Sequence, residues 1–232
     1  MSGIRANLLR VEERIAAAAE RAGRARGEIT LIGVTKTQPP EAIREAYEAG
    51  LRHFGENRVQ EWEGKRASLA DLDATWHLIG HLQSNKAARA TKAFHCIDSM
   101  DDFALAQRLD RARGGSGNAE KLRVLLEVHL GGEESKSGVE TSDLEELAER
   151  VVTLPHLQLA GLMCIPPFFE NARDARPYFR KLRESRDAVA KRLKLSLPVL
   201  SMGMSHDFEV AIEEGATEVR VGTAIFGARP GA

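Results

Sequence analysis

The chain has 232 residues, of which 43% are hydrophobic and 29% are charged, so it has an ordinary globular composition and enough length for one large domain or two small ones. Its formal net charge of −1 gives no electrostatic argument for a nucleic-acid or membrane partner. No apolar run is long enough to span a bilayer, and the charged N-terminal stretch lacks the apolar core of a signal peptide. Cys96 and Cys164 lie far apart in apolar runs, which is typical of reduced core cysteines, and we expect a cytoplasmic protein.

The hydrophobic pattern predicts an amphipathic N-terminal helix, followed by short apolar strands that alternate with helices. The expected strands cover residues 29–34, 53–55, 75–79, 93–97, 122–130, 157–163, 199–201 and 218–221. The expected helices cover residues 4–22, 41–49, 59–66, a stretch from about 84, 101–113, 142–152, 175–193 and a stretch capped by Ser205. Asp98 and Ser99 are expected to cap the helix at 101–113.

This alternation indicates βαβ units and therefore a parallel sheet. Eight such units that close on themselves form a TIM-type (β/α)8 barrel, and the chain has close to the usual length for one. We therefore expect an α/β fold in which residues 1–232 form a single barrel domain with an extra N-terminal helix. An open, doubly wound sheet is the alternative, because periodicity alone does not show closure.

A lysine follows the first predicted strand. Residues 29–34 form an almost unbroken apolar or β-branched run, as expected for a strand buried on both faces, and Lys36 stands two residues after it. Ligands of open α/β sheets and of α/β barrels bind at the carboxyl ends of the strands. Most lysines are simply solvated, but this position makes Lys36 a candidate ligand-binding residue.

Two glycine-containing loops follow the last two predicted strands, where barrels often bind a phosphate group. One loop contains Ser201, Gly203 and Ser205, and the other contains Gly222 and Thr223. Both offer hydroxyl groups and backbone N–H groups, and glycine allows a ligand to approach the backbone closely. Because acidic residues follow Ser205, we expect Gly222 and Thr223 to hold more of the phosphate. Each loop taken alone is equally consistent with an ordinary turn.

A lysine and a phosphate-binding loop on one rim suggest a ligand that is both a carbonyl compound and a phosphate ester. A deprotonated amine forms a Schiff base with an aldehyde, and burial at an apolar strand end lowers the pKa of a lysine. Pyridoxal 5'-phosphate (PLP) has both features, and so does the substrate of a sugar phosphate aldolase.

Several motifs along the chain resemble those of the pyridoxal phosphate homeostasis protein family, a single-domain relative of the alanine racemase barrel. They are VTKTQP at 34–39, FGENRVQE at 54–61, WHLIGHLQSNK at 76–86, SKSG at 135–138, GLMCI at 161–165, SMGMSHDFEVAI at 201–212 and VRVGTAIFGAR at 219–229. The motifs occur in the same order over almost the whole chain, so the resemblance is specific.

The resemblance implies that Lys36 carries PLP as a Schiff base, that Arg220 faces the pyridine nitrogen, and that Asn57 lines the ring pocket. It also implies that the phosphate is held by Ser201, Gly203, Gly222 and Thr223. The expected function is storage and transfer of PLP within the cell. The expected partners are PLP and, transiently, apo forms of PLP-dependent enzymes.

Other candidate sites are weaker. His77 and His81 are four residues apart, but they fall in a predicted strand and the turn after it. The sequence has no HExxH motif and its cysteines are not paired in sequence, so we expect no metal site. Lys136, in a charged loop, is a second amine that could react with the aldehyde, although a solvated loop is the favoured interpretation.

A racemase-like PLP enzyme is the alternative function. Racemisation needs a second base on the opposite face of the cofactor, which in alanine racemases is a tyrosine of a separate domain. The chain has two tyrosines, Tyr47 and Tyr178, both in predicted helices outside the barrel mouth, and it ends nine residues after Thr223. We therefore expect a protein without turnover. We also expect a monomer, because a closed barrel has no free strand edge.

Overall fold

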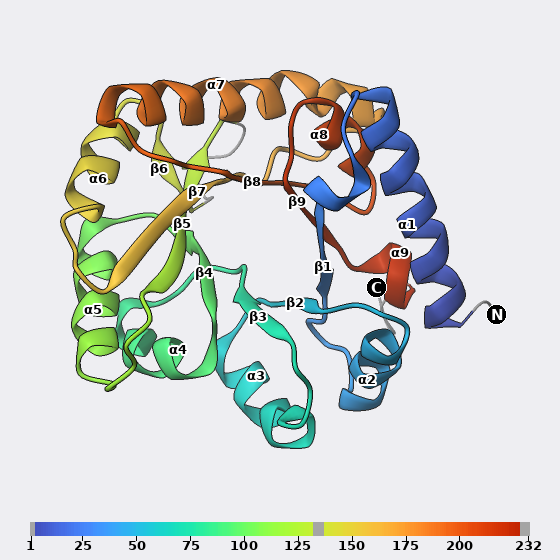
Figure 1. Cartoon of the computed structure of the whole chain (residues 1–232), viewed down its shortest axis with the longest axis horizontal. Coiled ribbons are helices and arrows are strands. Elements are labelled where there is room, and N and C mark those ends of the chain that lie inside the picture. The colour runs from blue at the N-terminus through green and yellow to red at the C-terminus, as the bar shows by residue number, and fades with distance from the viewer. Residues whose placement is uncertain (1–2, 132–136, 228–232) are drawn as a thin grey trace.

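The computed structural model describes residues 3–131 and 137–227 as a closed parallel barrel surrounded by helices (Figure 1). The barrel strands are β1 (Thr30–Val34), β2 (His53–Glu56), β3 (Thr75–Leu78), β4 (Cys96–Met100), β5 (Leu122–His129), β7 (Leu157–Met163), β8 (Val199–Met204) and β9 (Glu218–Val221). They pair in this order, β1 also pairs with β9, and every pairing is parallel. The predicted TIM-type barrel is confirmed, and the open-sheet alternative is wrong.

The outer layer consists of helices that alternate with the strands (Figure 1). The α-helices are α1 (Ile4–Arg21), α2 (Pro40–Glu48), α3 (Val59–Arg66), α4 (Ala87–Ala93), α5 (Phe103–Gly114), α6 (Leu144–Val151), α7 (Arg176–Leu193), α8 (Phe208–Glu213) and α9 (Thr223–Phe226). Short 3-10 turns cover η1 (Arg26–Glu28), η2 (Ala67–Leu69), η3 (Ser84–Lys86) and η4 (Ala172–Ala175). Within the described residues, no helix is long and apolar enough to cross a membrane.

The N-terminal helix α1 is amphipathic, as its sequence predicts, and its apolar side is buried against the barrel. It lies beside α8 and α9 at the opposite end of the chain (Figure 1). The side-chain amide of Asn7 donates to the carbonyl of Ile225 at 2.8 Å, and Arg14 makes a two-pronged ion pair with Glu209. The extra helix therefore covers the seam where the last strand meets the first.

Three local predictions need correction. Strand β4 begins at Cys96 rather than at 93 because Ala93 completes α4, and it extends to Met100, so Asp98 and Ser99 lie in the strand. Helix α5 is capped by Asp102, whose carboxylate accepts from the N–H of Leu105 at 2.8 Å.

The third correction concerns Ser205, which does not cap α8. That helix begins at Phe208 after Asp207, and the Ser205 hydroxyl instead accepts from backbone N–H groups of the loop after β9. Two short elements were also not predicted: α9, and the strand β6 (Val139–Glu140), which pairs with β5 outside the barrel.

The barrel interior is apolar in one part and polar in another. Leu125, Ala160 and Met163 form a small apolar cluster with Val199. The polar part surrounds His77, which is fully buried and lies 2.9 Å from the carboxylate of Asp98. Burial opposes a charge on His77, but the adjacent Asp98 carboxylate outweighs it and raises the pKa of the imidazole to about 10.

Candidate ligand site at the carboxyl ends of the strands

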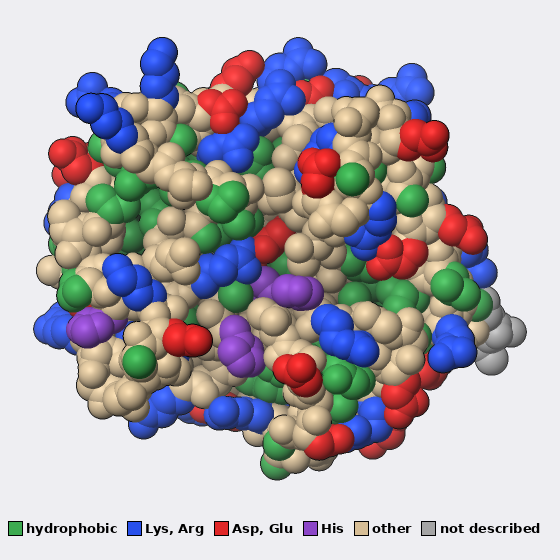
Figure 2. All heavy atoms as spheres, in the orientation of Figure 1, with side chains coloured by type: hydrophobic (Ala, Val, Ile, Leu, Met, Phe, Trp, Pro, Cys, Tyr) green, Lys and Arg blue, Asp and Glu red, His purple; other side chains and the backbone are tan. Residues whose placement is uncertain are grey.

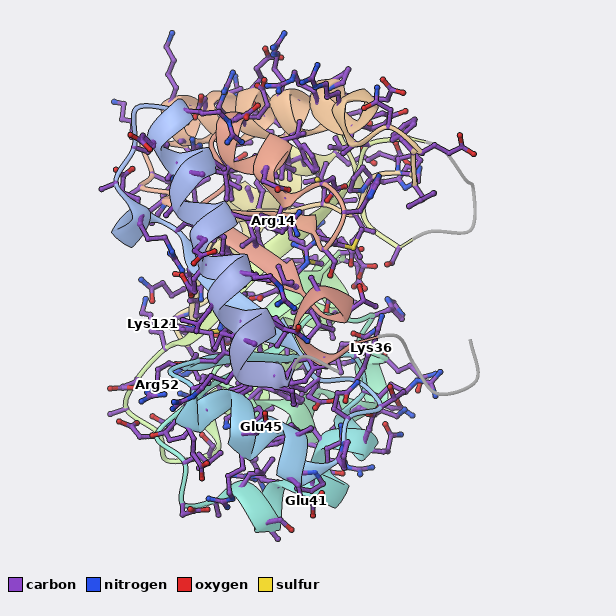
Figure 3. All side chains as sticks on the ribbon, turned by 90° about the vertical axis from the view of Figure 1, so that its right-hand side faces the viewer. Arg14, Lys36, Glu41, Glu45, Arg52 and Lys121 are labelled. Carbon is purple, nitrogen blue, oxygen red and sulfur yellow. The ribbon has the colours of Figure 1, made fainter. Side chains whose placement is uncertain are left out.

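Lys36 lies at the carboxyl-terminal rim of the barrel, half-buried, two residues after β1. Figure 3 shows it on the opposite side of the molecule from Arg52 and Lys121, which precede β2 and β5. Lys36 itself lies in the turn that follows the strand. Strand β9 pairs with β1 here, and a Cβ added at Gly222 would lie 3.4 Å from Val34 Cβ. The loop after β9 therefore packs against the end of β1, two residues before Lys36.

The backbone on both sides of Lys36 is held by charged groups from β2 and α3. The Nζ of Lys65 donates to the carbonyl of Thr35 at 3.0 Å and lies 3.1 Å from Glu56 Oε1. The Thr35 hydroxyl donates to the same Glu56 oxygen at 2.6 Å. Glu56 is fully buried, and burial raises the pKa of its carboxyl group although Thr35 and Lys65 lower it.

On the other side of Lys36, Thr37 has a φ of 65°, a left-handed conformation that a β-branched residue rarely adopts. Its N–H donates to the carboxylate of Glu61, which also pairs with Lys65 at 2.8 Å. Lys65 therefore connects the groups that fix residues 35 and 37. Lys65, Glu56 and Glu61 were not recognised in the sequence, where they look like ordinary charged helix and strand-end residues.

Arg220 lies in the barrel interior on β9 and is 3% exposed. Its guanidinium donates to the Ser201 hydroxyl at 2.8 Å and to the carbonyl of Cys164 at 2.8 Å. Neighbouring strands therefore fix the guanidinium, which places a permanent positive charge below the rim. The Ser201 hydroxyl is oriented towards Arg220, so its predicted contact with a phosphate stays a prediction.

The loops after β8 and β9 meet through Ser205. Its hydroxyl oxygen lies 3.2 Å from the backbone nitrogen of Gly222 and 3.3 Å from that of Ala224. These two N–H groups point towards a single acceptor, and an anion at the same place would find the same donors. Thr223, between them, is exposed, so its hydroxyl is accessible from the rim. The sequence analysis expected Ser205 to cap the next helix, whereas in the structure its hydroxyl joins these two loops.

Gly203 and Asn57 occupy tightly packed positions. Gly203 has a φ of 92°, and an added Cβ would come within 2.6 Å of Ala211 Cβ, so a glycine is needed where β8 passes α8. Asn57 directly follows β2, half-buried, and its carbonyl oxygen lies 2.5 Å from the point where a Cβ of Gly80 would be. The loop after β3 therefore packs directly on Asn57, which is consistent with a wall of a ligand pocket.

Two buried carboxyl groups lie under the influence of the Arg220 charge. Glu127, on β5, accepts from the Ser137 hydroxyl at 3.2 Å, and Asp207 accepts from the N–H of Met204 at 2.6 Å. Burial raises the pKa of both carboxyl groups, and Arg220 partly offsets the rise. Neither residue was recognised in the sequence as part of the site. Lys136 lies outside the described residues.

A barrel with a lysine after its first strand and a buried arginine on its last defines an alanine racemase-type barrel. The family model for the alanine racemase N-terminal domain matches residues 6–230. The chain is 53% identical over 222 residues to the pyridoxal phosphate homeostasis protein of Aquifex aeolicus, covering 96% of both chains, and 49% identical over 230 residues to that of Pseudomonas aeruginosa, covering 99% of this chain and 97% of the relative. The chain therefore belongs to the pyridoxal phosphate homeostasis protein family.

Solved structures agree with this assignment. PipY of Synechococcus elongatus, in a structure with PLP bound, is 43% identical, has a TM-score of 0.82, and is matched over 92% of this chain and 100% of its own. An alanine racemase of Clostridium difficile has a TM-score of 0.72 at 15% identity, and this chain covers 57% of it. The racemase likeness shows a shared fold only.

Proposed function

We propose that this protein binds PLP as a Schiff base on Lys36 and stores and transfers the cofactor in the cytoplasm without turning over a substrate. The observation that carries the proposal is the seam between β1 and β9, where Gly222 packs against Val34, two residues before Lys36, and Arg220 is buried on the neighbouring strand. The donor set fits PLP: an amine for the aldehyde, backbone donors for the phosphate, and a fixed guanidinium for the ring.

Each residue has a separate task in this proposal. PLP supplies an aldehyde that bonds covalently to an amine and a ring that withdraws electrons. Lys36 provides the amine, while Gly222 and Thr223 hold the phosphate, with Gly203 and Ser201 on the neighbouring strand. Asn57 lines the ring pocket. Arg220 would face the ring nitrogen, and because a guanidinium stays protonated it cannot keep a proton on that nitrogen.

The absence of turnover is part of the proposal. Tyr47 and Tyr178 lie on the outer helices α2 and α7, where Tyr47 packs against Arg52 and Tyr178 against Phe169. Neither tyrosine is therefore placed as the second base of a racemase. The protein would act as a monomer, because each of the eight barrel strands is paired on both sides.

Replacing Thr223 with valine tests the phosphate assignment. The change removes one hydroxyl donor, and a hydrogen bond to a charged group is worth about 1.5–3 kcal/mol. Affinity for PLP should fall roughly 10- to 100-fold, whereas affinity for unphosphorylated pyridoxal should barely change. Thr153→Val, at an exposed hydroxyl that bonds only its own turn, is the matched control. An equal loss for both ligands would remove Thr223 from the phosphate site.

A deuterium-exchange assay tests the absence of turnover. The loaded protein is incubated with each L-amino acid in deuterium oxide, and the α-proton is followed by NMR. We expect no sustained exchange, and we expect the same preparation to restore activity to an apo form of a PLP-dependent enzyme.

Sustained exchange that Lys36→Ala abolishes would favour the racemase-like alternative. In that case the buried carboxyl group of Glu127 would be the first candidate for the second acid–base group, and Glu127→Gln would test it. Failure to reactivate any apo enzyme would instead contradict the transfer role while leaving the binding role intact.

A further inference from the structure

The polar part of the barrel interior, at the amino-terminal ends of the strands, contains a second cluster of reactive side chains. His77 on β3 lies beside Cys96 and Asp98 on β4, and one ligand atom from each lies within 4.8 Å of the other two. All three side chains are at most 3% exposed. The cluster belongs to the end of the barrel opposite Lys36, so the proposed PLP site does not use it.

We propose that His77, Cys96 and Asp98 form a binding site for a divalent transition metal, with Zn²⁺ as the best fit. Imidazole, thiolate and carboxylate are the three side-chain ligands of zinc, at bond lengths of about 2.0–2.3 Å. Ligands around such an ion stand roughly 3–4 Å apart, so the present spacing of 2.9 Å between His77 Nδ1 and Asp98 Oδ2 needs only a small adjustment.

Two buried carboxylate oxygens in or near the cluster have no hydrogen-bond partner in the described part of the chain, which supports the binding of an ion there. Asp98 Oδ1 and Glu218 Oε2 have no hydrogen-bond partner among the described residues, and the two side chains are 0% and 4% exposed. An unpaired buried carboxylate oxygen is costly. A metal ion bound to Asp98, together with a water molecule as its remaining ligand, would satisfy both.

Neighbouring side chains orient His77 and Cys96. His53 Nδ1 lies 3.1 Å from His77 Nε2, so it can accept a hydrogen bond from that nitrogen and orient the ring, as outer groups commonly do for metal-bound histidines. Arg123 donates to the Cys96 sulfur at 3.3 Å and pairs with Glu218, so it holds the cysteine side chain in place. Replacing the protons of His77 and Cys96 by one divalent ion leaves the total charge of the group unchanged.

The cluster lies close to the amino-terminal face of the barrel, because His77 contacts His53 at the start of β2. His53 is only half-buried, and Figure 2, which looks onto this face, shows histidine, basic and acidic side chains next to one another near its centre. A bound ion would connect β3 to β4 beside the register shift in the pairing of β4 with β5. It would therefore act structurally, at one of the irregular strand pairings of the barrel.

Metal titration of the untagged, chelator-treated full chain tests the site. Co²⁺ should bind one ion per chain, with the thiolate charge-transfer absorption of a cysteine ligand in the difference spectrum, and Zn²⁺ should displace it. Cys96→Ala should lose that absorption and weaken binding more than about 100-fold, the upper range for loss of an outer-sphere partner. Cys164→Ala, at the other buried free cysteine, should retain both properties.

Alkylation of the wild-type chain gives a second readout that does not depend on a variant folding. In mild denaturant, Zn²⁺ should protect Cys96 from alkylation while Cys164 reacts at its unchanged rate, as mass mapping would show. The proposal is overturned if less than one ion binds per chain, if the absorption survives in Cys96→Ala, or if Zn²⁺ protects both cysteines equally.

Discussion

Replacing Lys36 with alanine should abolish the yellow colour of the purified protein. The wild-type chain should carry a visible chromophore, and borohydride should fix a pyridoxyl group on the peptide that contains Lys36. Borohydride also reduces free PLP, but it leaves a pyridoxyl group on the protein only where an imine joined the two, so the label reports the attachment point directly. The measurement is a visible spectrum before and after borohydride, followed by peptide mass mapping.

Lys86→Ala is the matched control, because Lys86 is another half-buried lysine and lies in the segment after β3. The control should keep the full chromophore and the label on Lys36. A full chromophore in Lys36→Ala, or a label found on the peptide that contains Lys86, would show that the attachment site is assigned to the wrong amine.

Replacing Lys65 with methionine should destabilise the fold by about 3–5 kcal/mol, the usual cost of removing one partner of a buried ion pair. The partner, Glu56, has a side-chain exposure of 0%, and Lys65 itself is 12% exposed. The change also releases the contacts that hold Thr35 and Glu61, so PLP should bind more weakly as well. Urea unfolding measures the first effect, and titration with PLP measures the second.

The loss of stability in Lys65→Met should depend on pH, in a direction set by Glu56. Burial already raises the pKa of Glu56, and the loss of Lys65 raises it further. A raised pKa favours folding below the pKa and disfavours it above, so the deficit of Lys65→Met should shrink as the pH falls.

Two further variants separate charge from packing. Glu56→Gln/Lys65→Met leaves no unpaired buried charge and should recover part of the lost stability. Arg44→Met breaks the exposed pair with Asp71 and should have little effect. If Lys65→Met loses no more stability than Arg44→Met, Lys65 does not hold the segment around Lys36.

Much of the fold could be predicted because the barrel strands are buried on both faces or paired on both sides. The expected strands at 157–163 and 218–221 coincide with β7 and β9, and the expected helix at 59–66 coincides with α3. One error falls where a polar residue lies inside the barrel. Asp98 looks like a helix cap in the sequence, but in the structure it faces His77, a partner 21 positions away.

Some residues of the candidate site could also be predicted from the sequence, and others could not. Lys36, Arg220 and Gly222 are singled out by the rule that ligands bind after barrel strands, together with the family resemblance; in the structure they lie on the paired strands β1 and β9 or directly after them, with Arg220 in the barrel interior. Ser205 could not be assigned from the sequence, because a serine before a helix looks like a cap. The role of Lys65 depends on contacts with Thr35, 30 residues away, which no local pattern reveals.

The seam between β1 and β9 also determines when the ligand site can exist. Lys36 is made well before Arg220 and Gly222, and α1 contacts the junction through α8 and α9. A nascent chain therefore has the amine long before it has the N–H groups proposed to hold the phosphate. PLP, once bound, would bridge β1 and β9 and hold the seam closed, since a ligand that binds only the closed form favours closure by mass action. Cofactor release and opening of this seam would then be coupled events.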